Sequence, residues 1–111
     1  MDKKIINKIL KFRNDRNWKQ FHTPKDLAIS ISLESAELLE NFQWSGKDLI
    51  CKNKKENISE ELADIMIYCI LMAEACKLDI DEIIKNKIAI NNKKYPVSKS
   101  KGNAKKYNEL V

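Results

Sequence analysis

The chain has 111 residues, of which 43% are apolar and 33% are charged. A chain of this length builds one domain or one subunit of an oligomer, and it is too apolar to be disordered. Two glycines and two prolines are too few for the many turns of an all-β protein. No apolar run approaches the ~20 residues that cross a bilayer, so we expect no membrane partner.

The net charge of +5 is concentrated near the C-terminal end. Residues 1–92 carry equal numbers of acidic and basic groups, so the whole excess lies in residues 93–111. The basic residues are almost all lysines, whereas proteins that read nucleic-acid sequence use arginine. The basic tail is therefore either a phosphate-binding segment or a solvated end, and nucleic acid is not the expected partner.

The three cysteines, Cys51, Cys69 and Cys76, form no C-x-x-C pair. Neither a disulfide framework nor a zinc site is indicated, and we expect them to be small core residues of a reduced protein. The first residues lead into an amphipathic stretch and not into a signal peptide. The sequence therefore predicts a cytoplasmic protein.

Apolar periodicity predicts two helices in the first part of the chain. The first covers about residues 2–17. Thr23 is the expected N-cap of the second, because Pro24 follows at the first helical position and Asp26 at the third. The apolar stripe of this second helix, at 24–42, is wide enough to be covered on two sides.

A third helix is expected at 60–78, after a loop at 43–58 that contains glycine and a run of lysine and asparagine. Asn57 and Ser59 are its candidate N-caps. No segment has the alternating pattern of a strand, and no internal repeat is present. The fold class is therefore all-α.

Asp79, with Glu82 three residues later, predicts the start of a fourth helix at 80–94. Tyr95-Pro96 ends that helix. We divide the chain into a helical domain at 1–96 and a basic C-terminal tail at 97–111.

Two pairs of carboxylates are the strongest chemical signal. Glu34 and Glu37 lie three residues apart on the second helix, and Glu61 and Asp64 lie three apart on the third, so each pair shares a helix face. If the two helices pack together, four carboxylates converge and need cations between them. Hard oxygen ligands favour Mg²⁺, with Mn²⁺ as a substitute. The alternative is that each pair is a solvated helix face.

Other metal and nucleophile sites are excluded by the residues present. A di-iron site of the ferritin type needs Glu-x-x-His on two helices, and the one histidine, His22, lies outside such a motif. No phosphate-binding glycine loop occurs.

The two tryptophans, Trp18 and Trp44, are either lids on the core or, beside an acidic metal site, a stacking slot for a nucleobase.

An ordered set of segments now carries a resemblance. The segments are 16–27 (RNWKQFHTPKDL), 34–40 (ESAELLE), 42–44 (FQW), 60–65 (EELADI), 68, 87–91 (KIAIN), 95–96 and 106–107. Taken together they resemble the MazG-like all-α nucleoside triphosphate pyrophosphohydrolases, and within that superfamily the short dCTP pyrophosphatase-like subtype. The resemblance implies a four-helix unit that assembles as a homodimer or homotetramer.

The resemblance implies a magnesium site made by Glu34, Glu37, Glu61 and Asp64, with Glu37 or Glu34 as the general base. Leu33 stands where the superfamily often has a further glutamate, as in the short subtype. The residues that the resemblance implies for substrate binding are Trp18, His22, Trp44, Tyr68, Lys87, Asn91, Tyr95, Lys106 and Tyr107.

The expected function is Mg²⁺-dependent hydrolysis of a (deoxy)nucleoside triphosphate, such as dCTP, to the monophosphate and pyrophosphate. Its cellular role would be removal of surplus or non-standard nucleotides. One alternative is a non-catalytic helical oligomer whose lysine-rich tail binds nucleic acid. Another is phosphoribosyl-ATP pyrophosphohydrolase, a related all-α family with a similar acidic site.

Overall fold

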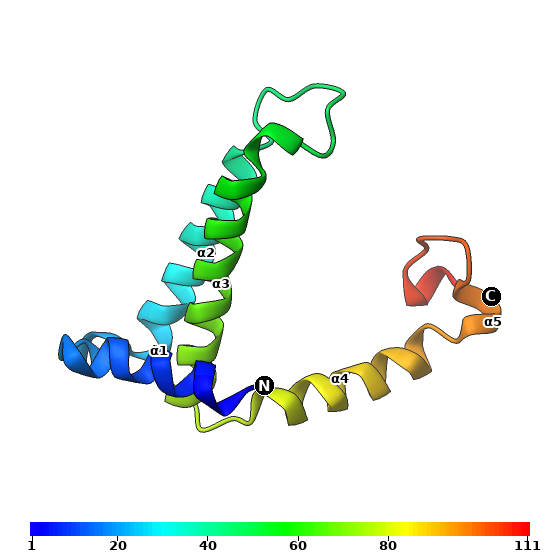
Figure 1. Cartoon of the computed structure of the whole chain (residues 1–111). Helices are drawn as coiled ribbons and strands as arrows, with labels where there is room; N and C mark the ends of the chain where they lie inside the picture. The colour runs from blue at the N-terminus through cyan, green and yellow to red at the C-terminus, as the bar shows by residue number, and fades with distance from the viewer. The chain divides into compact units, whose positions relative to one another are not determined.

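A computed structural model describes all 111 residues, and it contains helices and turns but no strands (Figure 1). The α-helices are α1 (Lys3–Asp15), α2 (Pro24–Glu40), α3 (Lys55–Ala75), α4 (Ile80–Lys94) and the short α5 (Val97–Ser100). The 3₁₀ turns are η1 (Lys19–Phe21), η2 (Lys52–Lys54) and η3 (Tyr107–Glu109). The prediction of an all-α protein with four main helices is confirmed. None of these helices has the length and apolar content that crossing a bilayer requires.

The chain forms two compact units, Met1–Leu78 and Asp79–Val111. The first contains α1, α2 and α3, and the second contains α4, α5 and η3. The division into a domain at 1–96 and a tail at 97–111 stays a prediction.

In the first unit, α2 and α3 lie side by side, and α1 contacts α3 (Figure 1). The core is small. Leu27 of α2 is almost completely buried, as are Ile70 and Leu71 of α3. Many large apolar side chains of α2 and α3 remain exposed, among them Ile29, Leu33, Leu39, Leu62 and Met66. The core of a single copy therefore covers only part of the apolar surface of these two helices.

Helix α1 ends earlier than the expected residue 17, because the chain adopts a left-handed conformation there. Asn17 has φ of 55°, and the backbone N–H of Trp18 donates to the carbonyl of Arg13 over 3.1 Å. The N–H of Asn17 also donates to the carbonyl of Asn14 over 3.0 Å. This is the Schellman arrangement, in which asparagine is one of the few residues that tolerates the left-handed position.

The predicted start of α2 is confirmed in detail. The Thr23 hydroxyl oxygen accepts a bond from the Asp26 backbone N–H at 3.2 Å, and Pro24 takes the first helical position. The predicted cap of α4 is confirmed as well, because an Asp79 carboxylate oxygen accepts from the Glu82 N–H at 3.0 Å. Both capping patterns could be found in sequence because they are local.

Helix α3 begins at Lys55 and ends at Ala75, so both expected boundaries of 60 and 78 were wrong. Asn57 is not an N-cap, since its side-chain amide donates to the Asn41 carboxamide oxygen at 2.6 Å. Lys54 donates to the Asn41 carbonyl at 3.1 Å. These bonds between the end of α2 and the start of α3 extend the helix, and no local pattern shows them.

Of the cysteines, Cys51 is buried, Cys69 is partly buried and Cys76 is exposed. All three are free thiols. Cys76 is exposed because it caps the C-terminal end of α3 and does not lie on its packed face. The expectation of a core position therefore holds fully for Cys51 alone.

We predict that Asn41→Ala lowers the free energy of unfolding by about 1–3 kcal/mol, because Asn41 is only 3% exposed and its loss leaves the Asn57 amide without its partner. Urea denaturation followed by circular dichroism measures this. Asn53→Ala, at an exposed position of η2, is the matched control and should change stability by no more than about 0.5 kcal/mol. Equal effects of the two substitutions would contradict a structural role of Asn41.

Candidate functional site

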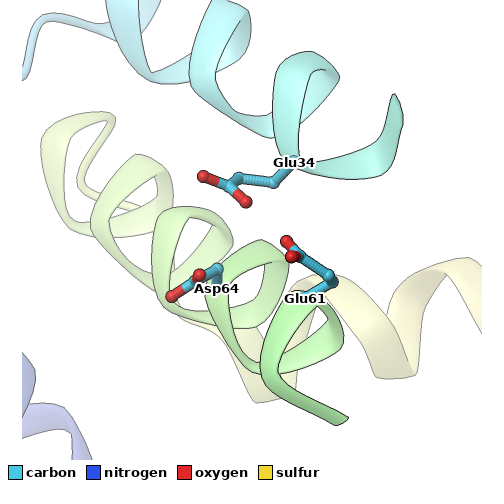
Figure 2. A group of neighbouring side chains, drawn as sticks. All are labelled: Glu34, Glu61 and Asp64. Atoms are coloured by element: carbon cyan, nitrogen blue, oxygen red, sulfur yellow. The ribbon is translucent and has the colours of Figure 1, made fainter. Parts of the chain in front are cut away.

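Three of the four predicted carboxylates converge between α2 and α3. Glu34 extends from α2 toward Glu61 and Asp64 of α3 (Figure 2), and oxygens of all three side chains lie within 4.8 Å of one another. Glu37 lies one turn further along α2 and interacts with the carboxyl groups of Glu34 and Glu61. The packing of α2 against α3 thus brings the two pairs close to each other.

The protein supplies no hydrogen-bond donor to the inner oxygens of this cluster. One carboxylate oxygen of Glu34 and one of Glu61 are shielded from solvent and have no hydrogen-bond partner. Removal from water, followed by the neighbouring carboxyl group of Glu37, raises the pKa of Glu34 to about 7. Removal from water and Glu37 also raise the pKa of Glu61. Unpaired, shielded carboxylate oxygens of this kind fit a hard divalent cation.

An aromatic cavity of about 550 Å³ lies beside the cluster. Its lining residues are Lys8, Ile9, Phe12, Arg13, Trp18, His22, Asp64, Ile67, Tyr68 and Leu71. The Trp18 and His22 rings meet edge to face at 6.2 Å, and His22 meets Tyr68 in the same way at 6.4 Å. The predicted base contacts Trp18, His22 and Tyr68 are therefore together, and Asp64 belongs to both the cavity and the cluster.

The surroundings of His22 favour its neutral form. Burial, and then the nearby Arg13 guanidinium, lower the pKa of His22 below its ordinary value of 6.5. Its Nδ1 atom is shielded from solvent and has no hydrogen-bond partner. A neutral imidazole has one donor and one acceptor nitrogen, so His22 can form a hydrogen bond with a ligand in the cavity.

A second, polar cavity of about 500 Å³ lies on the other side of the cluster. It is lined by Glu37, Glu40, Asn41, Lys54, Asn57 and Glu61. Apart from Ile67, the residues of α3 that line the two cavities and the cluster are Asn57, Glu61, Asp64, Tyr68 and Leu71. Their alternating spacing of four and three residues places them on one face of α3. This face changes from polar at its start, through carboxylates, to aromatic and apolar.

Trp44 does not reach the aromatic cavity of its own chain. It lies in the turn after α2 with φ of 66° and is 93% exposed. It lines neither the aromatic nor the polar cavity. The structure therefore does not place the two tryptophans on either side of one slot within a single copy.

The remaining predicted substrate residues belong to the second unit. Lys87 and Asn91 lie four residues apart near the end of α4, so they share a face. Tyr95 directly follows α4, and its backbone N–H donates to the Asn91 carbonyl at 2.8 Å. The Tyr95 ring meets the Tyr107 ring edge to face at 6.2 Å, and the Lys94 ammonium lies 4.8 Å from the centre of the Tyr107 ring. The tail therefore packs on α4 at Tyr107, next to Lys106.

The sequence analysis missed Arg13. This side chain is 4% exposed, lines the aromatic cavity and pairs with Glu74 of α3 at 2.7 Å. The available signal was an arginine next to the apolar stripe of α1, beside Ile9 and Phe12, in a chain with two arginines. Such an arginine has to find a buried partner or reach solvent.

The first unit is thus a helical scaffold that holds a carboxylate cluster between an aromatic and a polar cavity. The sequence profile of the MazG-like family matches residues 29–110. Among solved structures, a pyrophosphatase from Archaeoglobus fulgidus DSM 4304 superposes with a TM-score of 0.80 at 38% identity, over 85% of this chain and 91% of that one. The chain belongs to the MazG-like family, which confirms the resemblance found in the sequence.

Two named relatives are similar to this chain over most of its length. The chain is 36% identical over 104 residues to dCTP pyrophosphatase 1 of Bos taurus and 33% identical over 104 residues to that of Homo sapiens. These matches cover 89% of this chain. The chain spans 62% of the bovine protein and 61% of the human one.

The raised pKa of Glu34 predicts how stability depends on pH. A carboxyl whose pKa is raised by folding opposes folding above the raised value and has no effect below the unfolded one. The metal-free protein should therefore lose stability as the pH rises from 4.5 to about 7. Melting temperatures in EDTA at about pH 5 and about pH 8 measure this, with Glu34→Gln as the control that lacks the titrating group. The melting temperature of the wild type should fall more between these two pH values than that of the variant, and equal falls would contradict the prediction.

Proposed function

We propose that this protein hydrolyses a nucleoside triphosphate between its α and β phosphates, releasing the monophosphate and pyrophosphate. The observation that carries the proposal is the carboxylate cluster with unpartnered oxygens, directly beside a cavity of about 550 Å³ whose lining includes the aromatic rings of Trp18 and Tyr68. The names of the relatives, dCTP pyrophosphatase 1 and a pyrophosphatase, support it. The cellular role would be control of the nucleotide pool in the cytoplasm.

Glu34, Glu61 and Asp64 would hold Mg²⁺, with Mn²⁺ as a substitute, because hard oxygen donors suit these ions. When bound, such an ion offsets the charge of the phosphate oxygens and lowers the pKa of a bound water. Glu37 lies outside the group of three carboxylates that would hold the ion, and its side chain is exposed. Glu37 would take the proton of the attacking water while the bond between the α phosphate and pyrophosphate breaks; Glu34 is the other candidate for this base.

The aromatic cavity would hold the nucleobase against Trp18 and Tyr68, and His22 would contact its edge. Stacking tolerates any base, so discrimination requires polar contacts. Lysine binds phosphate as a point charge, and we assign Lys87, Asn91, Tyr95, Lys106 and Tyr107 to the phosphates. A deoxycytidine nucleotide is the substrate that we expect among the best.

The protein would work as a homodimer or homotetramer. The exposed apolar side chains of α2 and α3 favour burial against a second copy. A tryptophan that is 93% exposed leaves most of its ring in water, and contact with a partner copy would cover it. Under this proposal, the base contact of Trp44 is made to a cavity of another copy.

The proposal is tested by a pyrophosphate-release screen over ribo- and deoxynucleoside triphosphates, with and without Mg²⁺. Asp64→Asn and Glu37→Gln should each lower turnover at least about 100-fold, because one loses a metal ligand and the other a proton acceptor. Both variants should keep the wild-type circular dichroism spectrum.

The matched control for these variants is Glu60→Gln, at an exposed position of α3 next to Glu61, and its turnover should be normal. Turnover that needs no divalent ion, or normal activity of both site variants, would refute the assignment of Asp64 as a metal ligand and of Glu37 as the proton acceptor. Salt-sensitive binding of nucleic acid without any turnover would favour the tail-binding alternative.

Trp18→Ala should raise KM by about 10-fold or more, because a stacked base contributes about 1–3 kcal/mol. Trp44→Ala should have a comparable effect only in the assembled oligomer, which size-exclusion chromatography with light scattering identifies. Inhibition by pyrophosphate should be unchanged in both variants, because stacking involves the base alone. Unchanged kinetic constants in both variants would show that the two tryptophans do not contact the base and have only a structural role.

A further inference from the structure

The polar cavity at the start of α3 is lined by both hydrogen-bond acceptors and donors. It has a volume of about 500 Å³. Its lining consists of three carboxylates, one lysine and two carboxamides, namely Glu37, Glu40, Glu61, Lys54, Asn41 and Asn57. A cavity of carboxylates alone suits a free cation, and a cavity of lysines alone suits a free anion. A lining that combines the two suits an anion that carries a divalent cation with it.

Asn41 holds the two donors of this cavity in place. Its carbonyl accepts from the Lys54 ammonium at 3.1 Å, and its side-chain oxygen accepts from the Asn57 amide at 2.6 Å. Its own amide nitrogen donates to the carbonyls of Glu37 and Leu38 at the end of α2, over 3.4 and 3.1 Å. Asn41 therefore has no side-chain N–H left for a ligand, and it acts by fixing Lys54 and Asn57.

Lys54 and Asn57 keep N–H groups for a ligand. An ammonium group has three N–H bonds and a carboxamide has two. One N–H of each side chain is used on Asn41, so the Lys54 ammonium keeps two and the Asn57 amide keeps one. Because Asn41 already orders both side chains, a ligand that accepts these hydrogen bonds costs the protein little further side-chain entropy.

The order of groups along α3 relates this cavity to the rest of the site. Asp64 belongs to the aromatic cavity and to the carboxylate cluster, and Glu61 belongs to the cluster and to the polar cavity. At 1.5 Å per residue, Glu61 lies about 4.5 Å beyond Asp64 along the helix, and Asn57 lies about 6 Å further. A ligand that begins in the aromatic cavity and passes the cluster thus ends beside Asn57 and Lys54.

We propose that the polar cavity holds the pyrophosphate end of the substrate, with Lys54 and Asn57 donating to oxygens of the β and γ phosphates and Asn41 as the positioning residue. This inference rests on the proposed function, because it assumes that the α phosphate lies at the carboxylate cluster. The glutamates of the cavity suit the divalent cation that accompanies a polyphosphate, and they repel a polyphosphate without one. The cavity therefore selects the metal-bound form of the leaving group.

Calorimetry with inorganic pyrophosphate in the presence of Mg²⁺ tests this assignment. Lys54→Met should weaken the binding of pyrophosphate by about 10- to 100-fold, the range expected for hydrogen bonds to a charged group. The affinity for dCMP, which has no β or γ phosphate, should equal that of the wild type. Lys52→Met is the matched control, because it removes the same charge from an exposed position of η2 outside the cavity, and it should leave both affinities unchanged.

A comparison with Trp18→Ala separates a loss of phosphate contacts from general damage to the fold. Trp18→Ala should show the opposite pattern to Lys54→Met, with weaker binding of dCMP and unchanged binding of pyrophosphate. Lys54→Arg, which keeps the charge, should bind pyrophosphate more tightly than Lys54→Met does. In Lys54→Met the KM for dCTP should also rise by about 10-fold or more.

The inference is overturned if Lys54→Met binds pyrophosphate as tightly as the wild type does, or if it weakens pyrophosphate and dCMP by the same factor, even where triphosphates are hydrolysed. A wild-type protein that does not bind pyrophosphate overturns it as well. If Lys54→Met does not fold, Lys54→Gln, which can still donate to the Asn41 carbonyl, decides by the same measurements. Pyrophosphate binding that depends on Lys54, without hydrolysis of any triphosphate, would refute the proposed hydrolysis and leave the cavity as a pyrophosphate site.

Discussion

Three carboxylates that converge between two helices, with the carboxyl group of Glu37 beside them, are the constraint on which this molecule depends. Their repulsion opposes the pairing of α2 and α3, so other contacts must hold the helices together. At one end of the pair, Asn41 joins α2 to Lys54 and Asn57. Along it, Leu27 and Leu71 are buried. The scaffold thus holds together an electrostatically unfavourable arrangement, and under the proposed function a divalent ion would relieve it.

The parts that the sequence predicted are the local ones. Spacings of three residues determine which carboxylates share a helix face, and the caps at Thr23 and Asp79 involve neighbours in the chain. The start of α3 could not be found, because it depends on bonds to Asn41, thirteen to sixteen residues earlier in the sequence. The buried pairing of Arg13 with Glu74 spans sixty-one residues. The sequence also did not show that Trp44 lies 93% exposed in the turn after α2.

One face of α3 carries two carboxylates of the cluster and residues of both cavities. Asn57, Glu61, Asp64, Tyr68 and Leu71 follow one another along it, so polarity changes continuously over roughly 20 Å of helix, at 1.5 Å per residue. A rigid helix keeps the distances between these groups fixed. Under the proposed function, a molecule that is charged at one end and flat and apolar at the other would meet these groups in one orientation.

The buried pair of Arg13 and Glu74 also limits how this sequence can change over generations. Losing Glu74 alone leaves the Arg13 guanidinium, which is 5% exposed, without its partner, and this is far more damaging than losing both to apolar residues of similar size. The two positions lie sixty-one residues apart, yet a lineage that passes through a single replacement carries a defective intermediate. They are expected to be kept or exchanged together, so descendants fall into two groups with and without the ion pair, and few sequences lie between them.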